Sequence, residues 1–411
     1  MSARVRILIV TNGALCRNPR VLKEATALGR ARHDVTVLTI RNQAAAEQYD
    51  VDLLRTAPFQ RVVVDVMPTP THAAFRHRAV FKLARYAVRT FGWQTPEALG
   101  PYAALLQAAR ERPADLTIVH NEVAHCVGAQ LLAEGRRVSA DIEDWHSEDL
   151  LPADRRGRPL RLLRRVERTL LHRAAYTTTT SQALATALHH RYGGHQPTVI
   201  SNSFPLPPRP ERRGPGSTPA FFWFSQTLGP GRGLETFVAA WARTSRPSRL
   251  VLLGEGRPEY RAELLALVPS ERQAAVEFLP WVAPAELPAV IARHDIGLAL
   301  EDPAIVNRDL TITNKVLQYL GAGLAVVATA TAGQREVLAH DASTGVIVQD
   351  PSNTPVVTAL LDALLADPVG LLLRQQAARG LAEDIYCWER EEPRLLAQVS
   401  AALTKRAKFT S

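Results

Sequence analysis

The chain has 411 residues, which is above the ~250–300 residues at which a single hydrophobic core stops growing, so we expect two domains. Lys and Arg number 49 against 40 Asp and Glu, and the formal charge of +9 favours nucleotide sugars, acidic lipids or nucleic acid as partners. The sequence contains no zinc-finger, basic-zipper or aromatic-basic RNA-binding pattern, so we expect no nucleic-acid partner. The three cysteines lack the paired spacing of metal ligands and indicate a reducing compartment.

The first elements predict a parallel α/β sheet. Residues 5–11 are typical of a buried strand, residues 12–14 of a turn, and residues 35–40 of the next strand, with a helix that begins at Asn18-Pro19 between them. This order is a βαβ unit. Gly13 stands in the first loop. We expect Arg17 and Arg20 at a solvated helix end, with supply of positive charge to a ligand as the alternative.

Residues 75–93 predict a basic amphipathic helix after a strand at 62–67. Cations at i, i+4, i+7 and i+11 form one stripe, namely Arg78, Lys82, Arg85 and Arg89. Such a helix can lie on an anionic membrane, and a solvated basic face on an ordinary domain helix is the favoured alternative.

Polar residues follow two further predicted strands. Residues 115–120 end in His120, Asn121 and Glu122, and residues 138–144 lead into the acidic segment 144–149, which includes His146. The ends of parallel strands face the ligand crevice of such sheets, so His120 is either a site residue or a hydrogen-bonded core histidine. Asp144 and His146 either bind acceptor hydroxyls or act as a base, or they only cap the next helix.

The second half repeats the alternation of strands and helices. Strands are predicted at 175–181 and 198–204, and the Pro/Gly-rich residues 205–219 predict an interdomain linker. Further strands follow at 220–225, 250–256, 276–281 and 296–301. We therefore expect an N-terminal domain over 1–204, a second domain over 220–384, and a separate C-terminal segment over 385–411.

Residues 311–338 carry the clearest binding pattern. Thr313, Asn314 and Lys315 place a hydroxyl, an amide and an ammonium where a helix begins. Free N–H groups at a helix start favour a phosphate or diphosphate, although Thr and Asn also cap helices that bind nothing. A Gly-bearing stop at 321–323 and a small-residue strand at 325–329 come next.

The segment from Lys315 to Thr329 (KVLQYLGAGLAVVAT) resembles the donor-binding segment of the retaining glycosyltransferases of family four, which have the GT-B fold. The resemblance implies two Rossmann-like doubly wound domains that face a central cleft. It also implies a metal-independent, hexosyltransferase-like enzyme of bacterial type, which needs no cofactor beyond its nucleotide-diphosphate sugar. Residues 385–390 resemble the segment that crosses back to the N-terminal domain in such enzymes.

The resemblance assigns a role to several residues on the donor side. Arg232 and Lys315, with the helix start at Thr313 and Asn314, are expected to bind the donor diphosphate. Leu279 and Trp281 are expected beside the nucleobase, with a core position for Trp281 as an equal alternative. The remaining donor-side residues are Gly13, Gln226 and Gln318.

In the N-terminal domain, His120 takes the place of the family's active-site histidine, which contacts the transferred sugar. This match, together with the position of His120 at a strand end, favours a site residue over a core histidine. Acceptor-side residues are Asn121, Glu122, Asp144 and His146, and no residue is predicted to bind a metal.

The chain departs from the family at several positions. Gln226 replaces an arginine of the phosphate loop, and Gln318 replaces the glutamate that binds the ribose. The other glutamate of that pair falls on Leu310, so Glu301 or Asp309 takes its role, and the sequence does not decide between them.

The sequence thus predicts a retaining glycosyltransferase that uses a nucleotide sugar and an acceptor that is a glycan, a lipid-linked molecule or a small molecule. The alternatives are an epimerase or hydrolase of nucleotide sugars, and a non-catalytic binding protein. We expect a cytoplasmic protein, with membrane contact through residues 75–93 as an additional hypothesis. The sugar, the base, the acceptor and the oligomeric state are not predicted.

Overall fold

The computed structural model describes residues 4–67, 72–209 and 217–404. Two compact units divide the chain. Unit 1 comprises residues 1–200 and 392–411, and unit 2 comprises residues 201–391. The prediction set these boundaries at 204/205 and 384/385 instead. Of the predicted linker, residues 210–216 lie outside the described part of the chain.

Unit 1 contains a seven-stranded sheet in the order β3-β2-β1-β4-β5-β6-β7, and every neighbouring pair is parallel. The strands are β1 (Arg6–Val10), β2 (Asp34–Arg41), β3 (Gln60–Asp65), β4 (Leu116–His120), β5 (Val138–Ile142), β6 (Thr177–Thr179) and β7 (Thr198–Val199). The central strands β1, β4 and β5 are almost wholly buried, as expected for a parallel sheet with both faces covered.

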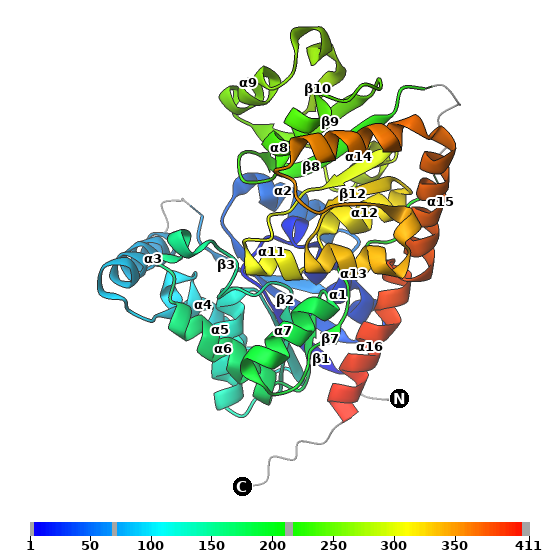
Figure 1. The fold of residues 1–411 in the computed structure, drawn as a ribbon. Coiled ribbons are helices and arrows are strands. Elements are labelled where there is room, and N and C mark those ends of the chain that lie inside the picture. The colour runs from blue at the N-terminus through cyan, green and yellow to red at the C-terminus, as the bar shows by residue number, and fades with distance from the viewer. Residues whose placement is uncertain (1–3, 68–71, 210–216, 405–411) are drawn as a thin grey trace. The chain divides into compact units, whose positions relative to one another are not determined.

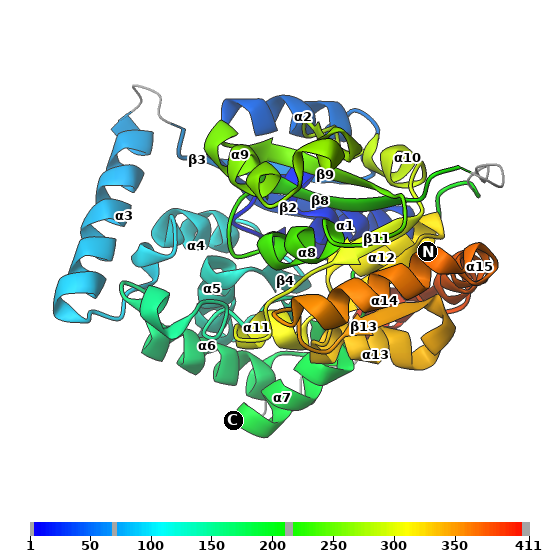
Figure 2. The same cartoon turned by 45° about the horizontal axis from the view of Figure 1, so that its top comes forward.

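Two groups of helices cover the faces of this sheet. One hydrophobic cluster joins alternate strand residues to α4 (Tyr102–Arg110), α5 (Glu122–Ala133) and α6 (Leu160–Arg173). The opposite cluster joins the other strand residues to α1 (Pro19–Arg30) and to the C-terminal helix α16 (Trp388–Thr404). The remaining helices of unit 1 are α2 (Ala44–Leu54), α3 (His72–Phe91) and α7 (Gln182–Tyr192). Figures 1 and 2 both show α3 at the outer edge of this unit.

Unit 2 contains a six-stranded parallel sheet in the order β10-β9-β8-β11-β12-β13. The strands are β8 (Ala220–Leu228), β9 (Arg249–Gly256), β10 (Val276–Leu279), β11 (Ile296–Ala299), β12 (Ala325–Thr329) and β13 (Gly345–Val348). One face packs on α8 (Leu234–Trp241), α9 (Pro258–Ala266) and α14 (Thr354–Ala366). The other packs on α10 (Leu287–Ile291), α12 (Asn314–Ala322), α13 (Ala332–His340) and α15 (Pro368–Asp384). A short helix, α11 (Val306–Leu310), precedes α12.

The predicted α/β class is confirmed, and the predicted strand limits lie within two residues of the observed ones except at two strand ends. The strand expected over 198–204 ends at Val199, because Glu391 accepts hydrogen bonds from the Ser201 backbone N–H (3.0 Å) and the Ser201 hydroxyl (2.6 Å), which takes this segment out of the ladder. The strand expected over 220–225 continues to Leu228 after a bulge, so Gln226 lies on β8 and is exposed, rather than in the following loop.

Within the described ranges, no single helix is long and apolar enough to cross a membrane, and one bent pair, residues 354–366 with 368–404, passes a test of length and composition.

Candidate functional site

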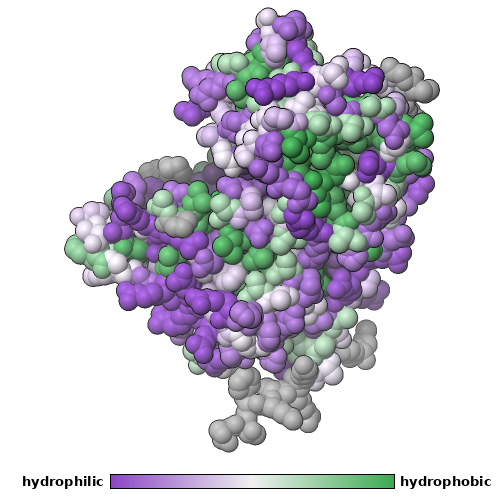
Figure 3. Space-filling view, in the orientation of Figure 1, coloured by the Kyte–Doolittle hydropathy of each residue, from purple (hydrophilic) through white to green (hydrophobic). Residues whose placement is uncertain are grey.

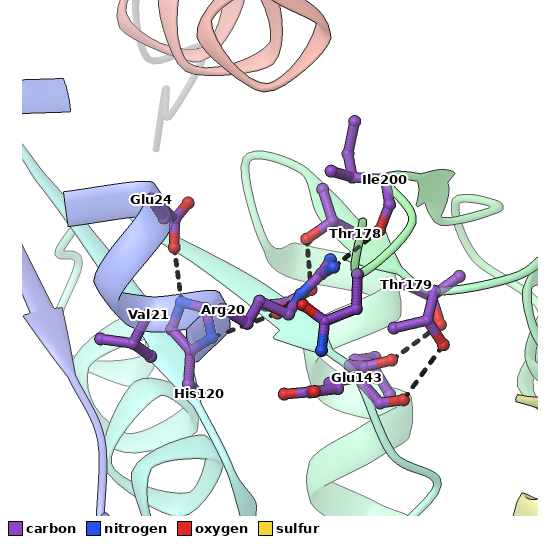
Figure 4. A network of polar contacts seen from close by, with 12 residues as sticks. Arg20, Val21, Glu24, His120, Glu143, Thr178, Thr179 and Ile200 are labelled. Carbon is purple, nitrogen blue, oxygen red and sulfur yellow. Dashed lines mark hydrogen bonds and ion pairs between the residues drawn. The ribbon is translucent and has the colours of Figure 1, made fainter. Parts of the chain in front are cut away.

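Each unit carries a polar cluster at the carboxyl edge of its sheet. The first cluster lies in unit 1, where β4 ends at His120 and β5 contains Asp141. Figure 4 shows His120 next to Glu24 in this cluster. The second lies in unit 2, where Glu301 and Thr329 come after β11 and at the end of β12. In parallel sheets this edge is where ligands bind.

His120 is buried between two carboxylates. Its Nε2 lies 2.6 Å from Glu24 Oε2, its Nδ1 lies 3.1 Å from Asp141 Oδ2, and only 1% of the residue is exposed. Burial favours the neutral ring, but Glu24 and then Asp141 overcome it and raise the pKa of His120 to about 10. The ring is therefore an imidazolium at neutral pH. The sugar contact stays a prediction, and it requires one of these carboxylates to give up its contact.

Arg20 completes this cluster and corrects the expectation of a solvated helix end. The residue is 6% exposed, its Nη2 donates to Asp141 Oδ1 at 2.7 Å, and its Nη1 donates to the Ile200 carbonyl at 2.7 Å. Thr178 Oγ1 also donates to Asp141 Oδ1 at 2.7 Å. Burial opposes ionisation of Asp141, but Arg20 and His120 hold its pKa well below the usual range. Arg17, in contrast, is exposed as predicted.

Asn121 adopts a backbone conformation that residues other than glycine rarely occupy. Its φ is 70° and its ψ is 165° at the start of α5. The amide oxygen accepts a hydrogen bond from the Thr11 hydroxyl at 2.5 Å, and Asn18 Nδ2 lies 3.5 Å away. Strain of this kind persists only where surrounding contacts impose it, and it is commonest at functional sites. Gly13 follows Thr11 by two residues. A Cβ added to Gly13 would meet no atom within 4 Å, so packing does not explain why a glycine is present there.

The loop after β5 brings Glu122 and His146 together. These two side chains and Asp149 each present one ligand atom within 4.8 Å of the others, a spacing that could hold a metal ion. Arg158 already pairs with both carboxylates, because its Nη2 lies 2.7 Å from Glu122 Oε2 and 3.2 Å from Asp149 Oδ2. His125 packs beside His146, with ring centroids 5.5 Å apart. The guanidinium of Arg158 is therefore the cation that this cluster binds.

Glu143 is a residue that the sequence analysis missed. Burial, and then the neighbouring Asp144, raises its pKa to about 7, so this carboxyl can gain or lose a proton near neutral pH. Asp144 itself is half-buried. No local pattern separates Glu143 from Asp141 and Asp144, the other acidic residues of this segment.

In unit 2, α12 begins without a side-chain cap. Thr313 is the N-cap residue, its side chain makes no capping hydrogen bond, and the first turn of the helix contains no acidic residue. The Thr313 hydroxyl is buried and, among the described residues, has no hydrogen-bond partner. Asn314 Oδ1 accepts a hydrogen bond from Asn202 Nδ2 at 2.9 Å. Within the described part of the chain, the Thr313 side chain thus leaves the N–H groups of this turn uncapped, and uncapped N–H groups suit an anion.

Lys315 is buried and paired. Its Nζ donates to Glu301 Oε1 at 3.0 Å and lies 5.6 Å from the centre of the Trp223 ring, and the two charged residues are 9% and 8% exposed. The predicted phosphate-binding ammonium therefore has a fixed carboxylate partner. Asp309, the other residue weighed for the missing glutamate, accepts a hydrogen bond from the Ala332 N–H at 3.0 Å where α13 begins.

A second helix start, that of α8, follows β8 through a glycine-rich loop. Gly231 and Gly233 have φ of 75° and 71°, and Gly233 is the N-cap residue without a side-chain cap. Arg232 lies between them and is half-buried. Arg308 Nη1 donates to the Gly231 carbonyl at 3.1 Å, which ties this loop to α11. The sequence therefore places a second set of N–H groups and a guanidinium in the same unit.

The other donor-side residues are spread over unit 2. Leu279 and Trp281 are half-buried in and after the edge strand β10, where both pack against the second core of the unit. Gln318 is half-buried on α12, three residues after Lys315. The nucleobase contact of Trp281 stays a prediction.

Comparisons with known proteins agree with this architecture. Residues 219–367 match the family model described as glycosyl transferases group 1. No curated protein sequence matches the chain.

Solved structures match over nearly the full length. Anabaena Alr3699/HepE in complex with UDP and glucose has a TM-score of 0.69 at 19% identity and covers 97% of this chain and 100% of its own. Sucrose-phosphate synthase from Thermosynechococcus elongatus has a TM-score of 0.71 at 15% identity, with the same coverage. A glycosyltransferase from Rickettsia africae has a TM-score of 0.65 at 11% identity over 98% of this chain and 100% of its own. At identities this low, the structural similarity establishes the fold alone.

Proposed function

We propose that this GT-B chain, whose residues 219–367 carry the group 1 glycosyltransferase segment, transfers a sugar from a nucleotide-diphosphate sugar to an acceptor with retention of configuration. The observation that carries the proposal is that match, because it contains both uncapped helix starts, at α8 and α12, together with Arg232 and Lys315. Anabaena HepE is solved with UDP and with UDP-glucose, so a UDP-hexose is the first donor to test.

Fixed positive charge in unit 2 would stabilise the leaving diphosphate. The N–H groups of α8 and α12 are oriented by their helices, and Lys315 is held by Glu301 at 3.0 Å. Donors that are already oriented need no rearrangement as negative charge develops on the leaving group, and this is a large source of catalysis. His120, as an imidazolium, would donate a hydrogen bond to the transferred sugar rather than act as a base.

We propose further that transfer needs no divalent metal and no other cofactor. Arg158 occupies the three-residue cluster of unit 1 that has ligand spacing, and its charge opposes a second cation there. Activity should therefore be the same before and after treatment with EDTA. Loss of activity that Mg²⁺ or Mn²⁺ restores would contradict this part of the proposal.

The first experiment is a thermal-shift panel with UDP, GDP, ADP and TDP and their sugar conjugates. A ligand at about 100-fold over its Kd stabilises the folded state by about 2.7 kcal/mol, which is readily seen. We expect a shift with one diphosphate family. No shift with any member, in a folded sample, would favour a protein without nucleotide-sugar binding.

Turnover is then followed by NMR with the identified donor. A retained anomeric configuration in a glycosylated product supports the proposal. Conversion of the donor sugar, or its release as free sugar, without any acceptor would indicate an epimerase or a hydrolase of the same fold. Binding without any turnover across an acceptor panel would indicate the non-catalytic alternative.

A further inference from the structure

The outward face of α3 is apolar, which the sequence pattern alone did not reveal. Phe75, Leu83 and Tyr86 are 66%, 68% and 62% exposed. Their spacing of i, i+8 and i+11 puts them on one side of the helix. Ala74 and Val88 are buried on the opposite side. The helix thus rests on unit 1 through small and branched residues and turns its large apolar side chains to the surface.

The same apolar character continues past the end of α3. Phe91 is 66% exposed and Trp93 is 61% exposed. Four of the five large aromatic residues that are exposed in the described chain fall within residues 75–93, the exception being Tyr49. Single exposed apolar residues are ordinary on protein surfaces, but a cluster on one element marks an interaction surface. We call the exposed side chains of residues 75–93 the α3 face.

The α3 face is also strongly cationic. Residues 72–93 contain no Asp or Glu, and Lys82, Arg85 and Arg89 are exposed on α3. The predicted four-residue basic stripe is reduced by one member, because Arg78 is half-buried and donates to the Met67 carbonyl. Figure 3 shows apolar and hydrophilic residues side by side over α3.

We propose that the α3 face docks the protein on an anionic lipid bilayer. A helix that carries aromatic and Leu side chains beside Lys and Arg, without acidic residues, has the composition of helices that lie in the bilayer interface. Self-association fits less well, since it would bring two faces of like charge together. This inference needs no glycosyl transfer, and it gives the proposed enzyme a class of acceptor, one carried by a lipid at the membrane surface.

The test is sedimentation of the full chain with vesicles of phosphatidylcholine alone and of phosphatidylcholine mixed with phosphatidylglycerol. We expect binding to the mixed vesicles only, weakened by salt as the charges are screened. A triple variant, Phe75→Ser with Leu83→Ser and Tyr86→Ser, removes the apolar part. A second, Lys82→Gln with Arg85→Gln and Arg89→Gln, removes the charges. Each should bind the mixed vesicles at least ~10-fold more weakly, with an unchanged unfolding temperature.

Matched controls exist elsewhere in the chain. Val369 and Leu373, which are 70% and 58% exposed on α15, supply an apolar control as Val369→Ser with Leu373→Ser. Arg165, Arg168 and Arg191 are exposed around a surface cavity of about 450 Å³ and supply a charge control when each is changed to Gln. Both controls should bind as the unaltered protein does.

Several outcomes would overturn the proposal. These are failure of the unaltered protein to bind the mixed vesicles, equal binding by the α3 variants, or an equal loss in the charge control. Sedimentation velocity separates the remaining alternative, because a dimer that the apolar variant dissociates, without any vesicle binding, would make the face a self-association surface. Trp93 adds a direct probe, since its fluorescence should be quenched by brominated lipid in the unaltered protein and not in Trp93→Phe.

Discussion

Two buried histidines of unit 1 hold opposite protonation states. His120 faces two carboxylates, and its pKa is raised to about 10. His125 lies one helical turn away, where burial and then His146 lower its pKa to about 3, and its Nε2 lies 2.8 Å from the Asp141 carbonyl oxygen. The neighbours, rather than the depth of burial, therefore decide which ring is charged.

The charged His120 predicts a stability that falls with alkaline pH. A pKa of about 10 in the folded state exceeds the ordinary value of 6.5, so this group contributes fully below pH 6.5 and loses its contribution as the pH rises toward 10. One such group changes the free energy of unfolding by about 1.4 kcal/mol per pH unit. We expect His120→Gln to be less stable at pH 6.5 and to lose less stability by pH 8.5, as measured by urea denaturation.

The pH window and the control are chosen to isolate this group. Below pH 8.5 the thiols of the half-buried Cys16 and the buried Cys126, whose ordinary pKa is 9.0, contribute little. His146, with a pKa raised to about 9, adds a slope of the same sign, so the variant should keep part of the dependence. His195→Gln, at an exposed position, should match the unaltered protein. An unchanged slope in His120→Gln would contradict the assigned charge.

Because Lys315 is paired with Glu301, we expect substitutions of this pair to affect stability and activity differently. Lys315→Ala leaves Glu301 buried without its partner, which typically costs about 3–5 kcal/mol, so the loss of activity in that variant would be ambiguous. The double variant Lys315→Met with Glu301→Gln removes both charges. We expect it to recover most of the stability and still to lose about 10²-fold or more in kcat/KM, the scale of a lost donor to a developing charge.

Thermal denaturation and steady-state kinetics on both variants check this prediction. Kinetics of the double variant that equal those of the unaltered protein would show that Lys315 has only a structural role.

For His120 and Lys315, the sequence predicted the element in which each residue lies, but it did not predict which side chains contact them. His120 and Lys315 were identified because local patterns place them at a strand end and a helix start. Glu24 and Asp141 lie 96 and 21 residues from His120, and Arg20 was expected in solvent. Long-range contacts of this kind are set by the order of the strands, which periodicity does not specify.

At the scale of elements, α12 is a helix whose start is left uncapped. A side chain that accepts a hydrogen bond from the first turn would stabilise this helix. The substitution Thr313→Asp supplies a stronger acceptor and a negative charge at the positive end of the helix dipole. We expect the free energy of unfolding to rise by about 0.5–1 kcal/mol. The affinity for a nucleoside diphosphate should fall about 10-fold or more, because the added carboxylate competes for the same N–H groups.

Calorimetric titration with the diphosphate found in the ligand panel measures this trade. Asn353→Asp, at the exposed and already capped start of α14, is the matched control and should leave the affinity unchanged. Undiminished affinity in Thr313→Asp would remove α12 from the binding site.

Periodicity predicted which segments form helices and strands, but it did not predict where some of these elements end. β7 was predicted too long because residues 200–204 are compatible with a strand, whereas Glu391, 190 residues away in sequence, accepts hydrogen bonds from Ser201 and takes this residue out of the ladder. The outward apolar side of α3 was also beyond the pattern, because a helical repeat gives two faces without stating which one meets the core.

At the scale of the whole chain, unit 1 is built from two segments that are not consecutive in sequence. Residues 392–411 belong to unit 1 although residues 201–391 of unit 2 precede them. Val399 and Ala402 of α16 are 0% and 3% exposed and pack in the same cluster as Ile7 of β1. The last helix is therefore part of the first core, and its packing should matter to the stability of unit 1.

Val399→Ala tests this dependence. Removal of buried methyl groups that pack in this cluster should lower the free energy of unfolding of unit 1 by about 2 kcal/mol, from lost burial and from the cavity left behind. Val369→Ala, at a position 70% exposed on α15, is the control and should have little effect. Differential scanning calorimetry with and without the bound diphosphate separates the units, since we expect the ligand to raise the transition of unit 2. If Val399→Ala lowers only the ligand-sensitive transition, the helix stabilises unit 2 and the division of the core is wrong.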